Sequence, residues 1–304
     1  MSQKEANIIV PVDLTNPGQF FACCGLLELA DRLWPGTEGE AGVVGWFERR
    51  QFCLHTDRSS RTLAELLNAT RQLRTWVDDV LEDPLEESDD DEEEESAKEP
   101  PFQPFCLRWQ DGKEAIYLNW WSDKSIKPWA GSMKDRPILR AMLAAIDPSH
   151  TSPFNDLRAV FDPAKSVHLT DGKKSRQKAP KKREPFYFDP RRGNKSHPLD
   201  SGFSPDVHKK VKSECCPALE ALCFIGLQRA RPAPTGVANQ SRYTVWPRVS
   251  ADKPGIPANL VGPVACGVVR FPGSFDYVFD NYFRTDQRKH KTFSQATLER
   301  SNNV

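Results

Sequence analysis

The segment NPGQFFACCGLLELADRLWPG, residues 16–36, constrains the fold most, because it joins helix boundary signals to a broad apolar stripe. Asn16 is a favourable N-cap, Pro17 suits the first helical position, and Gln19 occupies the capping-box position. Apolar side chains then recur at intervals of three and four until Pro35 and Gly36 end the pattern. They are Phe20, Phe21, Cys24, Leu26, Leu27, Leu29, Ala30 and Leu33. The segment is predicted to be a core helix.

Gly25 and a cysteine pair lie inside this helix. A helical glycine costs roughly 1 kcal/mol relative to alanine, so a second backbone is expected to pack closely at Gly25. Cys23 and Cys24 lie on or beside the apolar stripe, where free cysteine packs as a small hydrophobe. The eight cysteines contain no CxxC pair, and the nearest histidines do not complete a zinc spacing. Both thiols are therefore predicted to be core, with no metal site and no cofactor.

The formal net charge of zero conceals strong segregation of charge. Residues 78–99 hold fourteen acidic residues and one lysine, and without them 28 acidic residues face 41 basic ones. The low-complexity acidic stretch repels itself and ends in prolines, which predicts a disordered linker over residues 84–101. The alternative is an intramolecular decoy that covers a basic groove until nucleic acid displaces it.

Hydropathy excludes a membrane class for this chain. The mean hydropathy is −0.60, and no apolar run approaches the roughly 18 residues of a membrane span. The first residues lack the layout of a signal peptide. We therefore expect a cytoplasmic protein with no membrane partner and with reduced thiols.

The remaining patterns predict an α+β fold, with mixed strand–helix units around a basic, loop-rich middle. Helices are expected over residues 63–81, 136–146 and 217–230, in addition to 16–36. Strands are expected in residues 7–14, 46–56, 185–188, 241–249, 258–271 and 274–283, and a hairpin over 105–121 turning at Asp111 and Gly112. Five regions result: 1–83, the acidic linker 84–101, a Trp-rich hairpin and helix over 102–164, basic nucleic-acid-facing loops over 165–212, and an α+β region over 213–304.

Motifs for catalysis are absent from the sequence. It contains no GxxxxGK loop, GxGxxG turn, GxSxG elbow or HExxH helix, and no carboxylate pair stands out from surface acids. The six histidines are scattered, mostly through polar loops. Any of them could serve a metal-independent ribonuclease, but solvated or hydrogen-bonded loop histidines are the better interpretation. The chain is predicted not to be an enzyme.

Basic residues interleaved with aromatic residues indicate nucleic-acid binding instead. The loop NWWSDKSIKPWAGSMKDRP, residues 119–137, offers phosphate contacts and base or sugar stacking, the alternative being a structured loop over the sheet. Residues 165–212 contain fourteen basic and five acidic residues. Within them, KKSRQKAPKKRE also reads as a nuclear localisation signal, and FDPRRGNKSHPLDSGFSPD combines phosphate binders with an amide able to read a base edge. The two arginines of GLQRARP could simply complement a helix dipole.

The candidate nucleic-acid-binding residues are Lys127, Trp129, Ser132, Lys134, Arg136, Lys181, Lys182, Arg183, Arg191, Arg192, Asn194, Lys195, Arg229, Arg231 and Arg242.

Four motifs in order, NPGQFFACCGLLELADRLWPG, LNWW…KPWAG, PFYFDPRRGNKSHPLDSGFSPD and LCFIGLQRARP, resemble the CRISPR-associated large-subunit family of type I-G effectors, formerly called I-U. The resemblance spans residues 8–290. It implies a subunit of a Cascade complex that binds guide RNA and target DNA, recognises the PAM (protospacer-adjacent motif) duplex and helps open it. It also implies a backbone subunit, a fused handle-binding and processing subunit, and a helicase–nuclease as partners, with target specificity left to base pairing.

Two other interpretations remain open at this point. One is a metal-independent CRISPR endoribonuclease that uses a histidine with nearby lysines. The other is a nuclear chromatin- or RNA-associated binding protein, suggested by the acidic run and the lysine-rich stretch. An adjacent repeat array in the gene neighbourhood would separate the CRISPR interpretation from the nuclear one.

Overall fold

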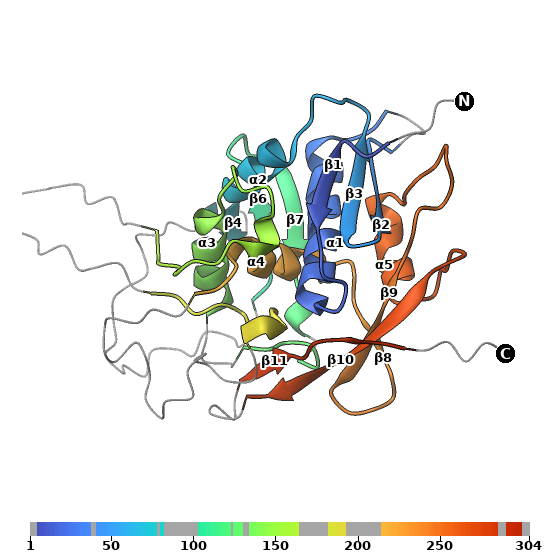
Figure 1. Cartoon of the computed structure of the whole chain (residues 1–304). Coiled ribbons are helices and arrows are strands. Elements are labelled where there is room, and N and C mark those ends of the chain that lie inside the picture. The colour runs from blue at the N-terminus through green and yellow to red at the C-terminus, as the bar shows by residue number, and fades with distance from the viewer. Residues whose placement is uncertain are drawn as a thin grey trace, which may run out of the picture.

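The computed structural model of the 304-residue chain describes residues 5–37, 41–77, 80–81, 103–122, 124–129, 134–163, 182–192, 214–284 and 290–299. The predicted acidic linker 84–101 lies outside these residues, as do Ser132, Lys181, Asn194 and Lys195. The fold is α+β, as the sequence predicts (Figure 1).

The helices are α1 (Pro17–Leu33), α2 (Leu63–Arg71), α3 (Asp135–Ala145), α4 (Pro217–Gly226) and α5 (Val261–Ala265). Short 3-10 turns occur at Trp120–Ser122, Pro153–Asn155, Pro190–Arg192 and Ala258–Leu260. The described part of the chain contains no helix of the length and apolar character that crossing a membrane requires.

The strands form three antiparallel sheets in the described residues. The first has the order β1-β3-β2 and consists of β1 (Ile8–Pro11), β2 (Val43–Glu48) and β3 (Gln51–Thr56). The second, β5-β4-β6-β7, consists of β4 (Arg74–Val77), β5 (Val80–Leu81), β6 (Phe105–Arg108) and β7 (Glu114–Leu118). The third sheet has the strand order β11-β10-β9-β8, and β12 also pairs with β10. Its strands are β8 (Ala233–Pro234), β9 (Gln240–Val245), β10 (Phe275–Phe283), β11 (Lys291–Phe293) and β12 (Thr297–Leu298).

The start of α1 confirms the predicted cap and changes one detail. The Asn16 side chain accepts a hydrogen bond from the backbone N–H of Gln19, at 3.2 Å. The Gln19 side chain does not close a reciprocal capping box, because its Oε1 accepts from the backbone N–H of Asp13 at 2.7 Å. Two backbone donors at the helix entrance are satisfied in this way.

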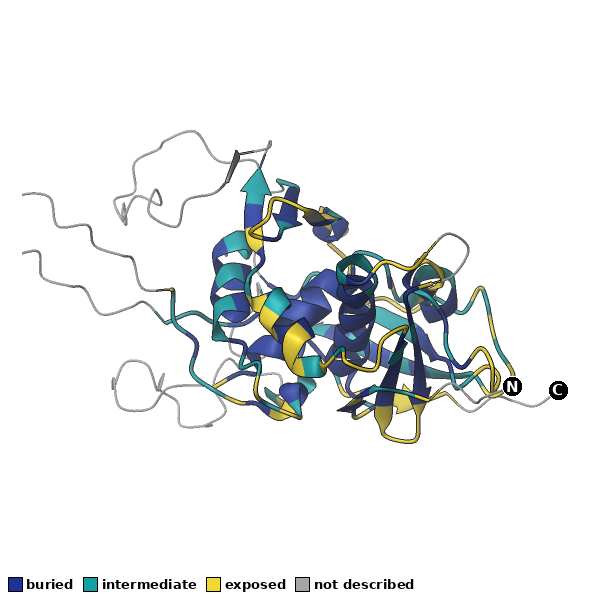
Figure 2. Ribbon diagram, turned by 90° about the horizontal axis from the view of Figure 1, so that it is seen from above, coloured by how far each residue is buried: buried dark blue, intermediate teal, exposed yellow. Residues whose placement is uncertain are grey.

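Helices α1 and α4 form the centre of the molecule, and both are buried along nearly their whole length (Figures 1 and 2). They meet at two glycines. A Cβ at Gly25 would lie 2.1 Å from the carbonyl oxygen of Leu222, and one at Gly226 would lie 2.0 Å from that of Phe21. The close backbone approach expected at Gly25 is therefore confirmed.

The packing around α1 and α4 buries the two cysteines of α1 and connects these helices to the sheets. Cys23 and Cys24 are buried, and burial raises the pKa of both thiols well above the usual value. The ring of Phe20 stacks on Tyr243 of β9, with centroids 4.4 Å apart. One hydrophobic core draws side chains from each predicted region other than 84–101.

Two predicted elements are divided by turns in the structure. The single strand expected over residues 46–56 is the hairpin β2–β3, which turns at Arg49 with a φ of 55°. The helix expected over 63–81 ends at Arg71, and β4 follows because residues 74–76 pair with β6. At the β2–β3 turn, residues 48–51 are all polar and mark the break, whereas the helical spacing after Arg71 shows no break before β4.

Three further predictions also differ from the structure. The strand expected over 258–271 is a 3-10 turn followed by α5, and α5 is followed by Gly267 at a φ of 78°. The helix expected over 217–230 ends at Gly226. Residues 185–188 form no strand: Tyr187 adopts a φ of 71°, and the run of buried rings packs into the core without a ladder partner among the described residues.

Candidate nucleic-acid interface

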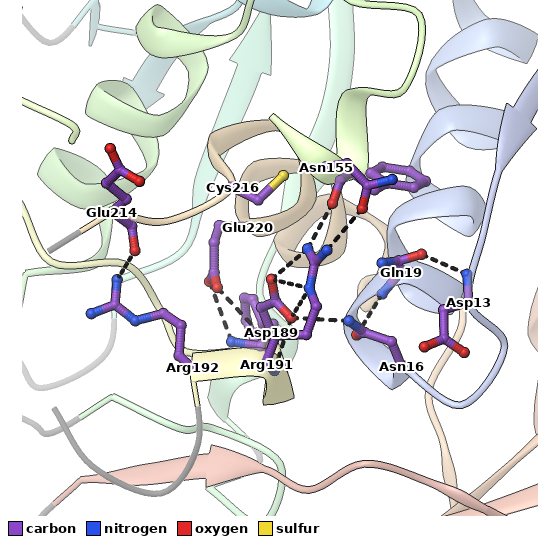
Figure 3. A network of polar contacts seen from close by, with 12 residues as sticks. Asp13, Asn16, Gln19, Asn155, Asp189, Arg191, Arg192, Glu214, Cys216 and Glu220 are labelled. Atoms are coloured by element: carbon purple, nitrogen blue, oxygen red, sulfur yellow. Dashed lines mark hydrogen bonds and ion pairs between the residues drawn. The ribbon is translucent and has the colours of Figure 1, made fainter. Parts of the chain in front are cut away.

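A buried polar network holds the DPRR turn, residues 189–192, against the two central helices (Figure 3). The Asp189 carboxylate accepts from Asn16 Nδ2 at 2.9 Å and from the guanidinium of Arg191, with Nη2 at 2.7 Å. Arg191 also donates to Asn155 Oδ1 and to the carbonyl oxygen of Phe154. Because these acceptors occupy the Arg191 guanidinium, its geometry is that of a structural residue rather than of a phosphate ligand.

Glu220 of α4 lies beneath the same turn and is fully buried. Its carboxyl oxygens accept from the backbone N–H groups of Phe188 and Asp189, each at 3.3 Å. Burial, with the nearby Asp189 carboxylate, raises the pKa of Glu220 to about 8. Glu220 is therefore mostly protonated in the folded protein at neutral pH, next to an acid that accepts hydrogen bonds from four nitrogen atoms.

This shift predicts a pH dependence of stability. Between the ordinary pKa of glutamate and about 8, the unfolded chain loses the Glu220 proton while the folded chain keeps it. The free energy of unfolding should therefore fall as pH rises through this window, by up to about 1.4 kcal/mol per pH unit. Urea unfolding of wild type and Glu220→Gln at several pH values measures the difference. A wild-type slope equal to that of the variant would contradict the prediction.

A second arrangement brings together cations from three segments of the chain. We call Lys127, Lys182, Arg192, Arg284 and Lys291 the basic junction. Hydrogen bonds join their three segments: the backbone N–H of Lys291 donates to the carbonyl oxygen of Pro128 at 2.7 Å. The N–H of Phe293 donates to the carbonyl oxygen of Tyr187 at 3.4 Å. Strand β11 is thus hydrogen-bonded to both the loop 124–129 and the segment 182–192.

The ring of Tyr187 is the centre of the basic junction. The guanidinium carbon of Arg284 lies 3.7 Å from the ring centroid, and that of Arg192 lies 4.9 Å from it. The Tyr187 hydroxyl donates to Glu184 at 2.8 Å, and Glu184 also pairs with Lys182 at 2.8 Å. Arg192 also approaches Glu184, at 3.5 Å, so this carboxylate pairs with two of the five cations.

The predicted Trp129 loop contributes a cation but no stacking surface. Trp129 is 3% exposed and packs on Phe186, with ring centroids 4.8 Å apart, so its assignment as a base-stacking residue is wrong. Lys127 lies 4.9 Å above the Trp129 ring, and partial burial lowers the pKa of its ammonium group. Lys134 is exposed, and Arg136 donates to Gln103 at 3.0 Å.

The other predicted cations are dispersed. Arg183 pairs with Asp162, and Arg242 on β9 pairs with Glu299 at 3.1 Å. Arg229 binds the buried carboxylate of Glu28 on α1, with Nη2 donating at 2.9 Å, so it joins the two central helices rather than complementing a helix end. Arg231 is exposed beyond α4. Of the described candidates, Lys127, Lys182 and Arg192 meet at the basic junction.

Sequence analysis missed Arg284, Lys291 and the exposed ring of Phe283, which lies at the end of β10 with Lys291 5.2 Å from its centroid. A signal for them exists. The segment NYFRTDQRKHK, residues 281–291, interleaves two aromatic residues with four basic ones and a histidine directly after the strand expected over 274–283.

Two of the described histidines form contacts with the backbone. His55 Nδ1 lies 2.7 Å from the carbonyl oxygen of Glu5, and His150 Nδ1 accepts from the N–H of Ser152 at 3.1 Å. Within the described ranges, no group of three or more His, Cys, Asp or Glu side chains is arranged to hold a metal ion.

Comparison with known proteins adds no further constraint, because no protein-family profile, curated protein sequence or solved structure matches the chain.

Proposed function

We propose that the chain is a non-catalytic, nucleic-acid-binding large subunit of a type I-G CRISPR Cascade, which acts in the cytoplasm with guide RNA and target DNA. In this role it recognises the PAM duplex, promotes opening of the target and helps recruit the helicase–nuclease. The backbone subunit and the fused handle-binding and processing subunit are its proposed neighbours.

The observation that carries nucleic-acid binding is the basic junction. Three segments far apart in the sequence bring five basic residues together beside Tyr187 and β11, and the carboxylate of Glu184 pairs with two of them, Lys182 and Arg192. The segment 182–192 adjoins residues 164–181 and 193–213, which hold ten basic and three acidic residues. Such a concentration of Lys and Arg is the electrostatic pattern of phosphate-backbone binding.

The four motifs that carry the family resemblance also meet in space, which supports treating them as one unit. Asn16 from the first motif donates to Asp189 in the third, at 2.9 Å. The indole N–H of Trp120 in the second motif donates to the carbonyl oxygen of Phe224 in the fourth, at 2.8 Å. The motifs thus build the scaffold that positions the basic junction.

Salt-dependent binding of short duplex DNA tests the proposal. The double variant Lys127→Ala/Lys291→Ala should weaken binding and flatten the slope of log affinity against log salt by about 1.8, since each lost phosphate contact contributes about 0.9. The matched control, Arg50→Ala/Lys253→Ala, removes two exposed cations outside the junction and should leave the slope unchanged.

Assembly is tested separately, by co-purifying the chain with the neighbouring Cascade subunits and guide RNA and comparing matched with mutated PAM duplexes. Wild-type protein that binds no nucleic acid, alone or assembled, would contradict the proposed function. Equal salt slopes for the junction variant and the control variant would show that the basic junction does not contribute to nucleic-acid binding.

A further inference from the structure

Phe283, the last residue of β10, lies outside the hydrophobic core formed by the described residues. Its side chain is 55% exposed, whereas Tyr277 and Phe279 of the same strand are buried in that core. Side chains alternate along a strand, so Phe283 shares the face of β10 that carries these two rings, but it lies beyond Asn281, the last buried residue of that face. A single exposed apolar side chain is ordinary, so the groups around the ring decide its interpretation.

Lys291 places a positive charge beside this ring. It is the cross-strand partner of Phe283 in the β10–β11 ladder, and its Nζ lies 5.2 Å from the ring centroid. The same Nζ donates to Oδ1 of Asn239 at 3.1 Å, which is a neutral acceptor. Among the described residues no carboxylate pairs with Lys291, and partial burial lowers the pKa of its ammonium group. An anion next to the exposed ring would therefore stabilise the charged form of Lys291.

Hydrogen bonds fix the strands that carry the ring and the ammonium group. Nδ2 of Asn281 on β10 donates to the carbonyl oxygen of Ser125 at 2.8 Å. The backbone N–H of Lys291 on β11 donates to the carbonyl oxygen of Pro128 at 2.7 Å. Both strands are thus tied to the loop 124–129 of the basic junction. A ring on a fixed strand loses little conformational freedom when a ligand binds, which favours affinity.

We propose that the exposed ring of Phe283 stacks on an unpaired base of a nucleic-acid strand, while Lys291 contacts a phosphate of that strand. An aromatic face beside a cation suits single strands, because every base has a π-face and every nucleotide carries a phosphate. A base inside a duplex is already stacked on its neighbours, so this contact favours single strands over duplexes. The inference rests on the proposed function, and it names the class of ligand that this edge of the basic junction takes: single-stranded RNA or DNA.

The test measures anisotropy of labelled oligouridylate, oligothymidylate and duplex DNA at about 50 mM and about 200 mM salt. Phe283→Leu keeps an apolar side chain but removes the π-face, so it should weaken single-strand binding by about fivefold or more and leave duplex binding unchanged. It removes no charge, so the salt slope should remain that of wild type, whereas Lys291→Ala should flatten the single-strand slope by about 0.7. A loss confined to RNA supports contact with the guide, and a loss confined to DNA supports contact with an opened target strand.

Three controls make the result specific to stacking. Phe283→Tyr keeps the aromatic face and should bind single strands as wild type does. Tyr117→Leu removes a ring that is 50% exposed on β7, outside the basic junction, and should change no affinity. An abasic DNA strand keeps its phosphates but offers no base, so wild type and Phe283→Leu should bind it equally.

Thermal unfolding without nucleic acid shows whether the ring supports the fold instead. Because Phe283 lies outside the core, Phe283→Leu should unfold at the temperature of wild type. A lower unfolding temperature, unchanged single-strand affinity, or an equal loss of affinity for abasic and base-containing strands would overturn the inference. Unchanged affinity with lost association of a Cascade subunit would assign the ring to a protein partner and also overturn it. Wild type that binds duplex but no single strand would overturn this inference alone, whereas wild type that binds no nucleic acid would count against the proposed function.

Discussion

Gly25→Ala should destabilise the protein by about 3 kcal/mol or more, although alanine is the better helix former. The added methyl would lie 2.1 Å from the carbonyl oxygen of Leu222, which belongs to the α4 backbone and cannot rotate away. The two helices would have to separate, and the side chains packed around them would lose contact. Urea unfolding measured by circular dichroism gives the change in the free energy of unfolding.

Two further variants make this result specific to the helix contact. Gly236→Ala adds a methyl where no atom lies within 4 Å, at a φ of 86°, so it should cost about 1–2 kcal/mol of backbone strain. Gly25→Ala/Gly226→Ala should cost less than the sum of its single changes, because the first substitution already separates the helices. A Gly25→Ala protein no less stable than Gly236→Ala would contradict the prediction.

Asp189→Ala should cost about 3 kcal/mol, since breaking a buried ion pair leaves its partners without an acceptor. Asp189 is 1% exposed, and its carboxylate accepts from Asn16 and from three nitrogen atoms of Arg191. The change would therefore loosen the entrance of α1 and the DPRR turn together. The free energy of unfolding from urea titration measures the loss.

Glu299→Ala is the matched control, because it removes an acid from a partly exposed pair with Arg242 and should cost no more than about 1 kcal/mol. Asp189→Asn keeps the shape and removes the charge that helps to raise the pKa of Glu220. The decline of stability with pH should then end at a lower pH than in wild type. Equal losses in the free energy of unfolding for Asp189→Ala and Glu299→Ala would show that the Asp189 network does not stabilise the fold more than an exposed ion pair does.

Elements that depend on near neighbours in the chain were predictable. The N-cap at Asn16, the apolar period of α1, and the tight turn with Gly112 at a φ of 80° each result from contacts within a few residues. The same reasoning found the start of α4 at Pro217 and most of β10. Local capping, periodicity and turn chemistry carry their own sequence signals.

Residues 72–81 show why other elements were not predictable. Their helical spacing continues that of α2, yet β4 forms because β6, about 30 residues later, supplies the hydrogen-bonding partners. The ladder satisfies backbone groups that the local sequence could have satisfied equally well in a helix.

Two adjacent arginines show most clearly what the sequence predicts and what only the tertiary structure decides. Arg191 and Arg192 are indistinguishable in sequence, but Arg191 is bound to Asp189 inside the fold while Arg192 lies over Tyr187 at the basic junction. The composition of residues 165–212 predicts a positively charged region, but the role of each arginine depends on the residues that surround it in the fold. The reason is physical: whether a guanidinium supports the fold or offers its donors to a ligand depends on acceptors such as Asn155, 36 residues away, that only folding brings within hydrogen-bond distance.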